Sequence, residues 1–210
     1  MKLIVFGATG GTGRQLVERG LAAGHEVTAF VRRPAAVTLR HERLRVAQGD
    51  VLQPETVAAA MRGQDAVLSA IGPPAGSKPG TLISTGMKHI VAAMQQHGVR
   101  RLVYESGLMV GDARGMGFVK RLLIAFFRRL NQALYLDKVL AEQIIRESGL
   151  DWVVVRPPNL KHVPARGGWR VGPDLDVNVL AGLSHADVAD FMVQAAPDVN
   201  GVRGVVDISY

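Results

Sequence analysis

Cysteine is absent from the 210-residue sequence, and long apolar runs are missing as well. Without cysteine the chain forms no disulfide, no thiolate metal site and no cysteine nucleophile, which fits a reducing compartment. The longest apolar candidate, residues 122–127, is far shorter than the roughly 18 residues needed to span a bilayer. No charged and apolar leader precedes the first expected strand, so we expect no secretory signal and a cytoplasmic location.

Acidic residues are fewer than basic ones, and the formal net charge is +7. A basic balance suits a nucleic acid or an anionic cofactor equally well. The basic residues have local explanations and no nucleic-acid recognition motif is present, so we expect no nucleic-acid partner. The histidines show no metal-ligand spacing and no G-x-S-x-G elbow occurs, so we expect neither a metal site nor a serine hydrolase.

Short β-branched runs alternate with helical stretches along the chain. We expect strands at 3–6, 27–31, 44–47, 66–71, 102–104, 152–155 and 205–208. We expect helices from the first glycine turn to residue 23, at 54–61, at 81–96 with Gly98 as C-cap, at 116–148 with a break near Asn131, and at 184–195 with Ser184 as N-cap. This alternation predicts an α/β fold, a Rossmann-type doubly wound parallel sheet with helices on both faces. No linker stands out, so we expect one domain over 1–210, with the irregular stretch 161–183 as a small substrate-side lobe.

A glycine-rich turn, GATGGTG at 7–13, joins the first strand to the first helix. Glycines three apart permit a tight turn, close approach of a pyrophosphate and close packing of the helix on the strand. The N–H groups and positive dipole end of the helix then face the phosphates. The place between a strand and a helix favours a dinucleotide site over a merely glycine-rich loop. The expected cofactor residues here are Gly7, Thr9, Gly10, Gly11, Thr12 and Gly13.

Arg32 and Arg33 follow the second expected strand. Folds that prefer NAD usually carry an acidic residue about 20 residues beyond the glycines, to hold the ribose hydroxyls. Two guanidiniums instead suit a 2′-phosphate, which they grip in a bidentate manner. The alternative is a solvated basic loop. We predict NADP(H) as the cofactor.

The ends of the third and fourth expected strands supply further cofactor residues. Asp50, beside Val51, either accepts a hydrogen bond from the adenine amino group or forms a turn before the helix that begins at Pro54. Ala70, Ile71 and Gly72 end the fourth strand across the switch point from the first, where ligands bind in open α/β sheets. We expect all five at the cofactor.

Several motifs taken together resemble a known family. GATGGTGR, VRRP, GDV, SAIG and SGLDWVVVRPP recur in the order seen in atypical short-chain dehydrogenases of the NmrA-like, NAD(P)H-binding type. GQDAVLSAIG, HIVAAMQQHGV and RESGL are most similar to the biliverdin reductase B, or flavin reductase, branch of that family. The resemblance covers nearly the whole chain and implies a Rossmann fold, NADPH binding and hydride delivery to a flat aromatic acceptor such as a flavin or tetrapyrrole. Asn159 departs from that branch, which has histidine there, and 111–130 is a distinct insertion.

The resemblance also implies catalytic residues. Ser106 follows the fifth strand, where the family presents a serine that would donate to the acceptor or touch the cofactor; a strand-end serine bonded to its own backbone is the alternative. The usual tyrosine and lysine lie four residues apart, whereas Tyr135 lies three before Lys138, still on one helix face. A packing tyrosine and a surface ion pair of Lys138 with Glu142 are the alternatives. The segment that would touch the nicotinamide comprises Pro157, Asn159 and Leu160.

We therefore predict an NADPH-dependent reductase of a flavin, quinone or similar conjugated acceptor. Such rings accept hydride easily because the cofactor carries the hard chemistry, so an imperfect Tyr–Lys pair argues only against ketone and alcohol substrates. The alternative function is an NmrA-like redox sensor that binds NADP(H) without turnover. We expect a monomer or a weak dimer.

The stretch 114–130 is basic and apolar and contains no acidic residue. Its basic residues are Arg114, Lys120, Arg121, Arg128 and Arg129. Three roles are open: packing on the core, lying on a membrane surface, or walling the acceptor pocket. Because apolar residues cover more of the helix than one core stripe needs, we expect a pocket wall with transient membrane contact.

Overall fold

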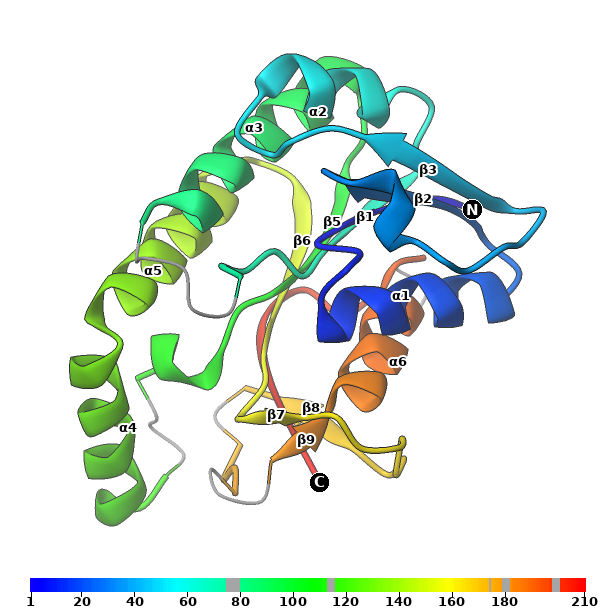
Figure 1. Ribbon diagram of the computed structural model, residues 1–210. Helices are drawn as coiled ribbons and strands as arrows, with labels where there is room; N and C mark the ends of the chain where they lie inside the picture. The colour runs from blue at the N-terminus through cyan, green and yellow to red at the C-terminus, as the bar shows by residue number, and fades with distance from the viewer. Residues whose placement is uncertain (75–79, 113–115, 174, 179–181, 198–200) are drawn as a thin grey trace.

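The molecule is built on one eight-stranded sheet. The computed structural model describes residues 1–74, 80–112, 116–173, 175–178, 182–197 and 201–210. The strand order is β3-β2-β1-β4-β5-β6-β10-β8, and every neighbouring pair is parallel except β10 with β8 (Figure 1). The strands are β1 Lys2–Phe6, β2 Glu26–Val31, β3 Leu44–Gln48, β4 Ala66–Ser69, β5 Arg101–Glu105, β6 Asp151–Arg156, β8 Arg170–Gly172 and β10 Gly204–Ser209.

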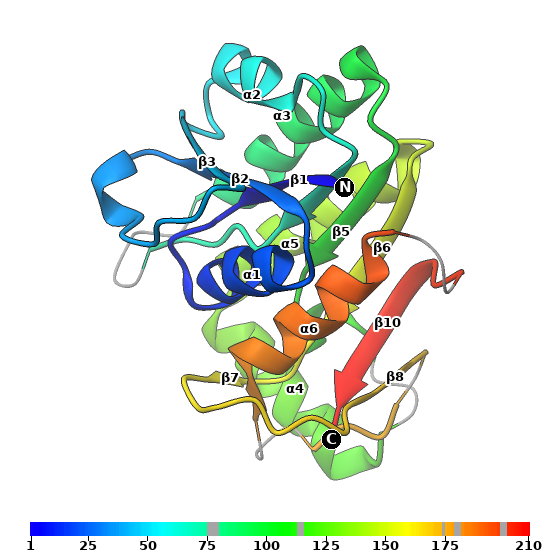
Figure 2. The ribbon, with the colours of Figure 1, turned by 90° about the vertical axis from the view of Figure 1, so that its right-hand side faces the viewer.

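Helices cover both faces of the sheet, which confirms the predicted fold class. One face carries α1 Gly11–Ala22 and α6 His185–Ala195, and the other carries α2 Pro54–Met61, α3 Leu82–His97 and α5 Gln132–Glu147 (Figure 2). The alternation of side chains along β1 explains the two layers. Leu3 and Val5 belong to the core cluster on the α1 side, whereas Ile4 and Phe6 belong to the cluster on the α3 side. The short 3-10 turns η1 Pro34–Ala36 and η2 Leu108–Val110 follow β2 and β5.

The predicted helix signals agree with the structure. Gly98 ends α3 at a φ of 70°, and the Ser184 hydroxyl accepts a hydrogen bond from the Asp187 N–H at 2.9 Å. The long helical stretch breaks at Asn131, which separates α4 Phe118–Leu130 from α5. Arg114 lies outside the described residues. Over the part of the chain that is described, no helix combines the length and apolarity needed to cross a bilayer.

Two expectations about strands differ from the structure. The fourth strand ends at Ser69, so Ala70 and Ile71 belong to the loop that follows it. The stretch 161–183 contains the edge strand β8, and its two ends pair in parallel as β7 Leu160–Lys161 and β9 Leu183–Ser184. Strands of two or three residues carry too little periodicity to be recognised from sequence. The predictions of one domain and of a substrate-side lobe stay predictions.

Candidate functional site

The glycine turn lies at the carboxyl edge of the sheet, between β1 and α1. Gly7 has a φ of 80°, and a Cβ at this position would overlap the carbonyl oxygen of Ala70. A Cβ at Gly13 would overlap the carbonyl oxygen of Gly7. Only glycine therefore fits at both positions, which brings the start of α1 close against β1. Gly10 is the N-cap of α1 and supplies no side-chain cap, so the first-turn N–H groups stay available to an anion.

A first cavity of about 420 Å³ extends from this turn over the ends of β2, β3 and β4. Its lining brings together residues that the sequence predicted separately at four strand ends. They are Gly7, Thr9, Gly10, Arg32, Arg33, Asp50, Val51, Ala70, Ile71 and Gly72. A side chain at Gly72 would meet nothing within 4 Å, so the chain there leaves the cavity open.

The arginines of the first cavity are exposed. Over the described residues, neither Arg32 nor Arg33 forms an ion pair with a carboxylate, so both guanidiniums remain available for a ligand. Asp50 lines the same cavity, and its carboxylate also accepts the N–H of Leu52 at 3.0 Å. The turn role of Asp50 is thus present in the structure, while a role toward adenine stays a prediction.

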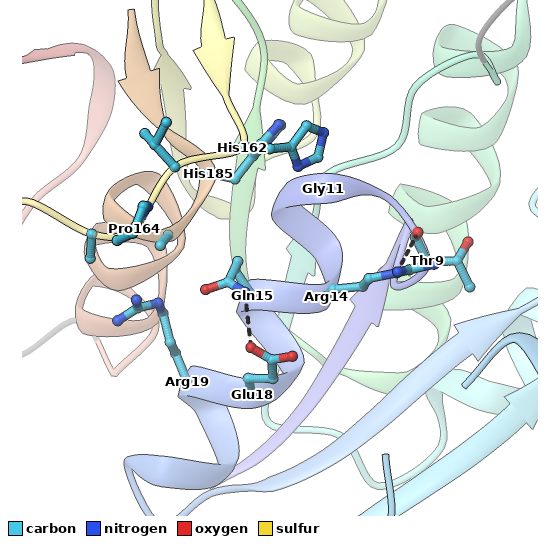
Figure 3. A pocket seen from close by; sticks show the side chains of 12 residues that line it. Thr9, Gly11, Arg14, Gln15, Glu18, Arg19, His162, Pro164 and His185 are labelled. Carbon is cyan, nitrogen blue, oxygen red and sulfur yellow. Dashed lines mark hydrogen bonds between the residues drawn. The ribbon is translucent and has the colours of Figure 1, made fainter. Parts of the chain in front are cut away.

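Gly11 lines a different cavity, shown in Figure 3, whereas Thr12 is buried and lines neither this cavity nor the first one. A cavity of about 670 Å³ separates the start of α1 from the start of α6 and the loop after β7. Thr12 Oγ1 and His185 Nδ1 lie 2.8 Å apart, and the His162 ring packs on His185 at a centroid distance of 4.5 Å. Burial, with His162 adding to it, lowers the pKa of His185 below its usual value. A neutral His185 therefore ties α6 to the first turn of α1.

A second cavity of about 450 Å³ lies beyond the ends of β5 and β6, with α4 and α5 beside it. It holds most of the residues predicted for the acceptor and nicotinamide: Ser106, Lys138, Pro157, Asn159 and Leu160. Apolar side chains complete its wall, namely Leu108, Met109, Ile124, Phe127 and Pro158. The predicted residues of the two strand ends are thus gathered at one site, although their roles stay predictions.

Ser106 belongs to a buried polar network. Its hydroxyl donates to Glu142 Oε1 at 2.6 Å. The fully buried Glu142 also accepts from Arg156 and Arg146, each at 2.6 Å to Oε2. The alternative of a surface Lys138–Glu142 ion pair is therefore wrong, since Glu142 lies inside the protein and pairs with arginines. The Ser106 hydroxyl thus bonds to the distant Glu142 side chain and not to its own backbone, as the alternative interpretation had it.

Helix α5 brings Lys138 to the second cavity but leaves Tyr135 outside its lining. The Lys138 ammonium donates to the carbonyl oxygen of Ser106. Burial lowers the pKa of Lys138, while the nearby carboxylates Glu105, Glu142 and Asp137 oppose this shift. The Tyr135 ring instead lies under the guanidinium of Arg128, 5.3 Å from its centroid. Tyr135 and Lys138 thus have different surroundings although they lie three residues apart on one helix.

Residues 7–198 match the model of a family described as NAD(P)H-binding. The chain belongs to this family. It is 31% identical to an uncharacterized chloroplastic protein of Arabidopsis thaliana, over 99% of this chain and 76% of that protein. It is 32% identical to a (4-alkanoyl-5-oxo-2,5-dihydrofuran-3-yl)methyl phosphate reductase of Streptomyces griseus, over 74% of this chain but only 46% of that enzyme.

Solved structures confirm the Rossmann-type fold of this NAD(P)H-binding protein. The anaerobilin reductase ChuY of Escherichia coli O157:H7 superposes with a TM-score of 0.79 at 22% identity, covering 100% of this chain and 97% of that one. A short-chain dehydrogenase/reductase of Veillonella parvula in complex with NADP gives a TM-score of 0.79 at 18% identity, covering 100% and 94%. At these identities the likeness establishes the fold alone. The family match shows an NAD(P)H-binding protein, while the reductase activity named for the Streptomyces griseus relative belongs to that enzyme.

The residues of this NAD(P)H-binding protein fit a dinucleotide. A Cβ at Gly7 or Gly13 would overlap a backbone carbonyl oxygen, so the tight turn that a pyrophosphate needs depends on both glycines. Arg32 and Arg33, which form no ion pair within the described residues, line the same cavity as Gly7. The cofactor would be held by the turn, by the ends of β2 to β4, and by the segment after β6. 

Two carboxylates with unusual surroundings were not predicted from the sequence, namely Glu105 and Asp137. Glu105 ends β5 at the second cavity, and within the described residues its Oε2 is buried with no hydrogen-bond partner. Burial raises the pKa of Glu105, and Lys138 opposes the shift. Asp137 is buried and accepts the N–H groups of Ile83 and Ser84 at 2.8 and 2.9 Å, so α5 caps the start of α3. A charged residue closing the apolar run LVYE was the available signal for Glu105; nothing local indicated Asp137.

Proposed function

We propose that the protein is an NADPH-dependent reductase that delivers hydride to a flavin, quinone or similar conjugated acceptor. One observation carries the proposal. At the same edge of the sheet, one cavity is lined by glycines and by two arginines that form no ion pair within the described residues. A second, largely apolar cavity beside it is lined by Lys138. The first suits a phosphorylated dinucleotide, and the second suits a flat, weakly polar ring.

The first cavity favours NADPH over NADH. Arg32 and Arg33 would hold the 2′-phosphate through charge-assisted hydrogen bonds, and no acidic side chain stands in their place after β2. The first-turn N–H groups of α1 would bind the pyrophosphate. Pro157, Asn159 and Leu160 line the second cavity and would bind the nicotinamide end of the cofactor.

The second cavity supplies the surroundings that the acceptor needs. When bound, NADPH supplies a hydride from its nicotinamide and leaves as NADP⁺, so the acceptor gains two electrons and must also gain one proton. Lys138 lies on the cavity and gives that proton to the acceptor anion, after which solvent restores it. Burial lowers the pKa of Lys138, and the nearby carboxylate of Glu105 opposes this shift. Leu108, Ile124 and Phe127 exclude water from the ring.

Ser106 and Tyr135 have no proton-transfer role in this proposal. The Ser106 hydroxyl donates its hydrogen bond to Glu142, which also pairs with Arg156. Ser106 therefore positions the end of β5. Tyr135 packs under Arg128. A ring that accepts hydride easily does not need the tyrosine that protonates alkoxides in ketone reduction. The absence of cysteine suits a reducing compartment, and we propose a cytoplasmic location.

The test is an acceptor screen with purified protein. We expect steady oxidation of NADPH with riboflavin, FMN or small quinones, and slower oxidation with NADH at the same concentration. Lys138→Met serves as a matched variant that keeps the length and apolar stem of the side chain. Tight NADPH binding measured by calorimetry, together with no turnover of any acceptor, would overturn the reductase and favour an NADP(H)-binding sensor.

A further inference from the structure

Helix α4 exposes its apolar face to solvent. Phe118, Val119, Leu122, Phe126 and Leu130 are 79%, 78%, 62%, 57% and 63% exposed. At about 100° per residue these five side chains fall within an arc of roughly 120° on the helix. Single exposed apolar residues are ordinary on a protein surface, but a contiguous arc of this size marks an interaction surface.

The opposite face of α4 already holds the helix on the protein. Ile124 is 4% exposed and packs in a small cluster with Leu108, Met116 and Val177. Arg128 donates to the carbonyl oxygens of Met109 and Gly111, and Lys120 pairs with Asp176 at 2.6 Å. The helix extends away from the sheet at the far end of α5 (Figure 1). The apolar arc is therefore not the face that packs on this chain.

The charges of α4 select the partner. Between residues 118 and 130 the helix carries four basic residues and no acidic one. Arg121 and Arg129 are exposed and lie beside or within the apolar arc, where their stems can lie along apolar surface and their guanidiniums reach phosphates. A second copy would bring an equally basic helix against the first, which like charges oppose. An anionic lipid surface offers both the apolar layer and the complementary charge.

We propose that α4 is an interfacial helix that seats the protein on an anionic membrane surface, with its apolar arc in the headgroup boundary. The same helix contributes Ile124 and Phe127 to the second cavity. If the proposed function holds, an apolar acceptor such as a lipid quinone would enter beside α4 without crossing water. Membrane binding itself does not depend on that function.

Vesicle co-sedimentation tests the proposal with the full chain. We expect binding to vesicles of mixed phosphatidylglycerol and phosphatidylcholine at low salt, weak binding to phosphatidylcholine alone, and release as salt screens the basic residues. The double variant Leu122→Ser/Phe126→Ser should bind about tenfold or more weakly, because two buried side chains of the interface are lost. Leu52→Ser/Val163→Ser is the matched control, since these residues are 47% and 50% exposed elsewhere on the molecule.

A charge series separates the electrostatic part. Arg121→Gln/Arg129→Gln should weaken binding to anionic vesicles, whereas Arg45→Gln/Arg62→Gln removes the same net charge from exposed positions outside α4 and should leave binding nearly unchanged. Equal binding by the α4 variants and their controls would overturn the proposal, as would no binding of the unmodified protein to anionic vesicles. If sedimentation velocity shows a dimer that Leu122→Ser/Phe126→Ser dissociates and vesicles do not bind, the face joins two copies instead. NADPH affinity, unaffected in all variants, reports the integrity of the fold, and acceptor turnover is measured separately.

Discussion

Arg32 and Arg33 are the residues that we expect to determine the preference for NADPH over NADH. Because a charge-assisted hydrogen bond contributes roughly 1.5–3 kcal/mol, removing one should weaken NADPH binding about 10- to 100-fold. NADH has no 2′-phosphate, so its affinity should hardly change. Titration calorimetry on Arg32→Ala and Arg33→Ala measures both, with Arg45→Ala on the neighbouring β3 as the control. Equal affinity of the unmodified protein for the two cofactors would refute this reading.

Lys138 is the side chain on which proton delivery depends. Lys138→Met should lower kcat by about tenfold, below the roughly 10²–10⁴-fold of full acid–base catalysis, because a conjugated ring is reduced easily. NADPH affinity should stay unchanged, and the loss of rate should shrink at low pH, where solvent supplies the proton. Tyr135→Phe is the control and should change little. Loss of turnover in Tyr135→Phe with NADPH binding intact would instead restore a catalytic Tyr–Lys pair.

Single site residues could be predicted from the sequence where the local backbone geometry requires a particular residue type. Gly7 and Gly13 are required by overlap with neighbouring carbonyls, and the arginines follow β2 directly, so both could be predicted. The partner of Ser106 could not, because Glu142 lies 36 residues away and is brought there by packing of α5. Glu142 has the spacing of a surface pair and is fully buried.

Among the elements, α3 depends on α5 for the start of its helix. Asp137→Ala should destabilise the protein by about 1–3 kcal/mol, because two N–H groups of α3 lose their buried acceptor. Urea denaturation measures the loss. Glu147→Gln on the same helix, whose carboxylate takes part in an exposed bond to Gln143, should be nearly neutral. Similar losses in both variants would mean that α5, rather than this cap, is the sensitive feature.

Helix α4 should act on the acceptor and not on the cofactor. Phe127 lines the second cavity while its neighbour Phe126 points outward, so the two form a matched pair. Phe127→Ala should raise the KM for apolar quinones several-fold and leave NADPH affinity unchanged, because only acceptor contacts are removed. Phe126→Ala should leave soluble-acceptor kinetics unaltered. If both variants behave alike in the kinetics, α4 is not a wall of the pocket.

The predictability of each element followed its length. The helices and the seven parallel strands of the main sheet had clear periodicity and glycine, proline or serine boundaries, and they were placed within a few residues. β7, β8 and β9 have two or three residues each and are defined only by their partners. Arg101 opens β5 although it is charged, because its buried guanidinium donates to the carbonyl oxygens of Ala195 and Val202. That bond could not be read from the local sequence.

For the whole molecule, His185 makes stability depend on pH. Its pKa is lowered in the folded state, by burial first and then by His162, from the value of 6.5. As pH falls below about 6.5 the unfolded chain takes up this proton and the folded one does not, so the free energy of unfolding decreases until the folded-state pKa is reached. His185→Gln should therefore lose less stability than the unmodified protein between about pH 7 and pH 5.

Urea titrations at several pH values measure this difference. Glu105 acts in the opposite sense, since its raised pKa makes its contribution decrease as pH rises above 4.5, but it is present in both proteins and cancels. Parallel profiles of unfolding free energy against pH for the two proteins would show that the pKa of His185 does not change on folding.

The strand order also sets the sequence of events as the chain leaves the ribosome. β1 emerges first and becomes the middle of the first half of the sheet; β2 adds to β1, β3 to β2, and β4 to the free side of β1. β5, β6 and β10 then extend the sheet one strand at a time, so each parallel strand meets a partner that has already been synthesised. β8 is the exception. It is synthesised before its partner β10, so its edge has no partner strand while α6 is being synthesised. Arg170 lies at one end of β8 and Pro173 just beyond the other, and charged residues and proline are the residue types that oppose pairing of an open strand edge with another chain.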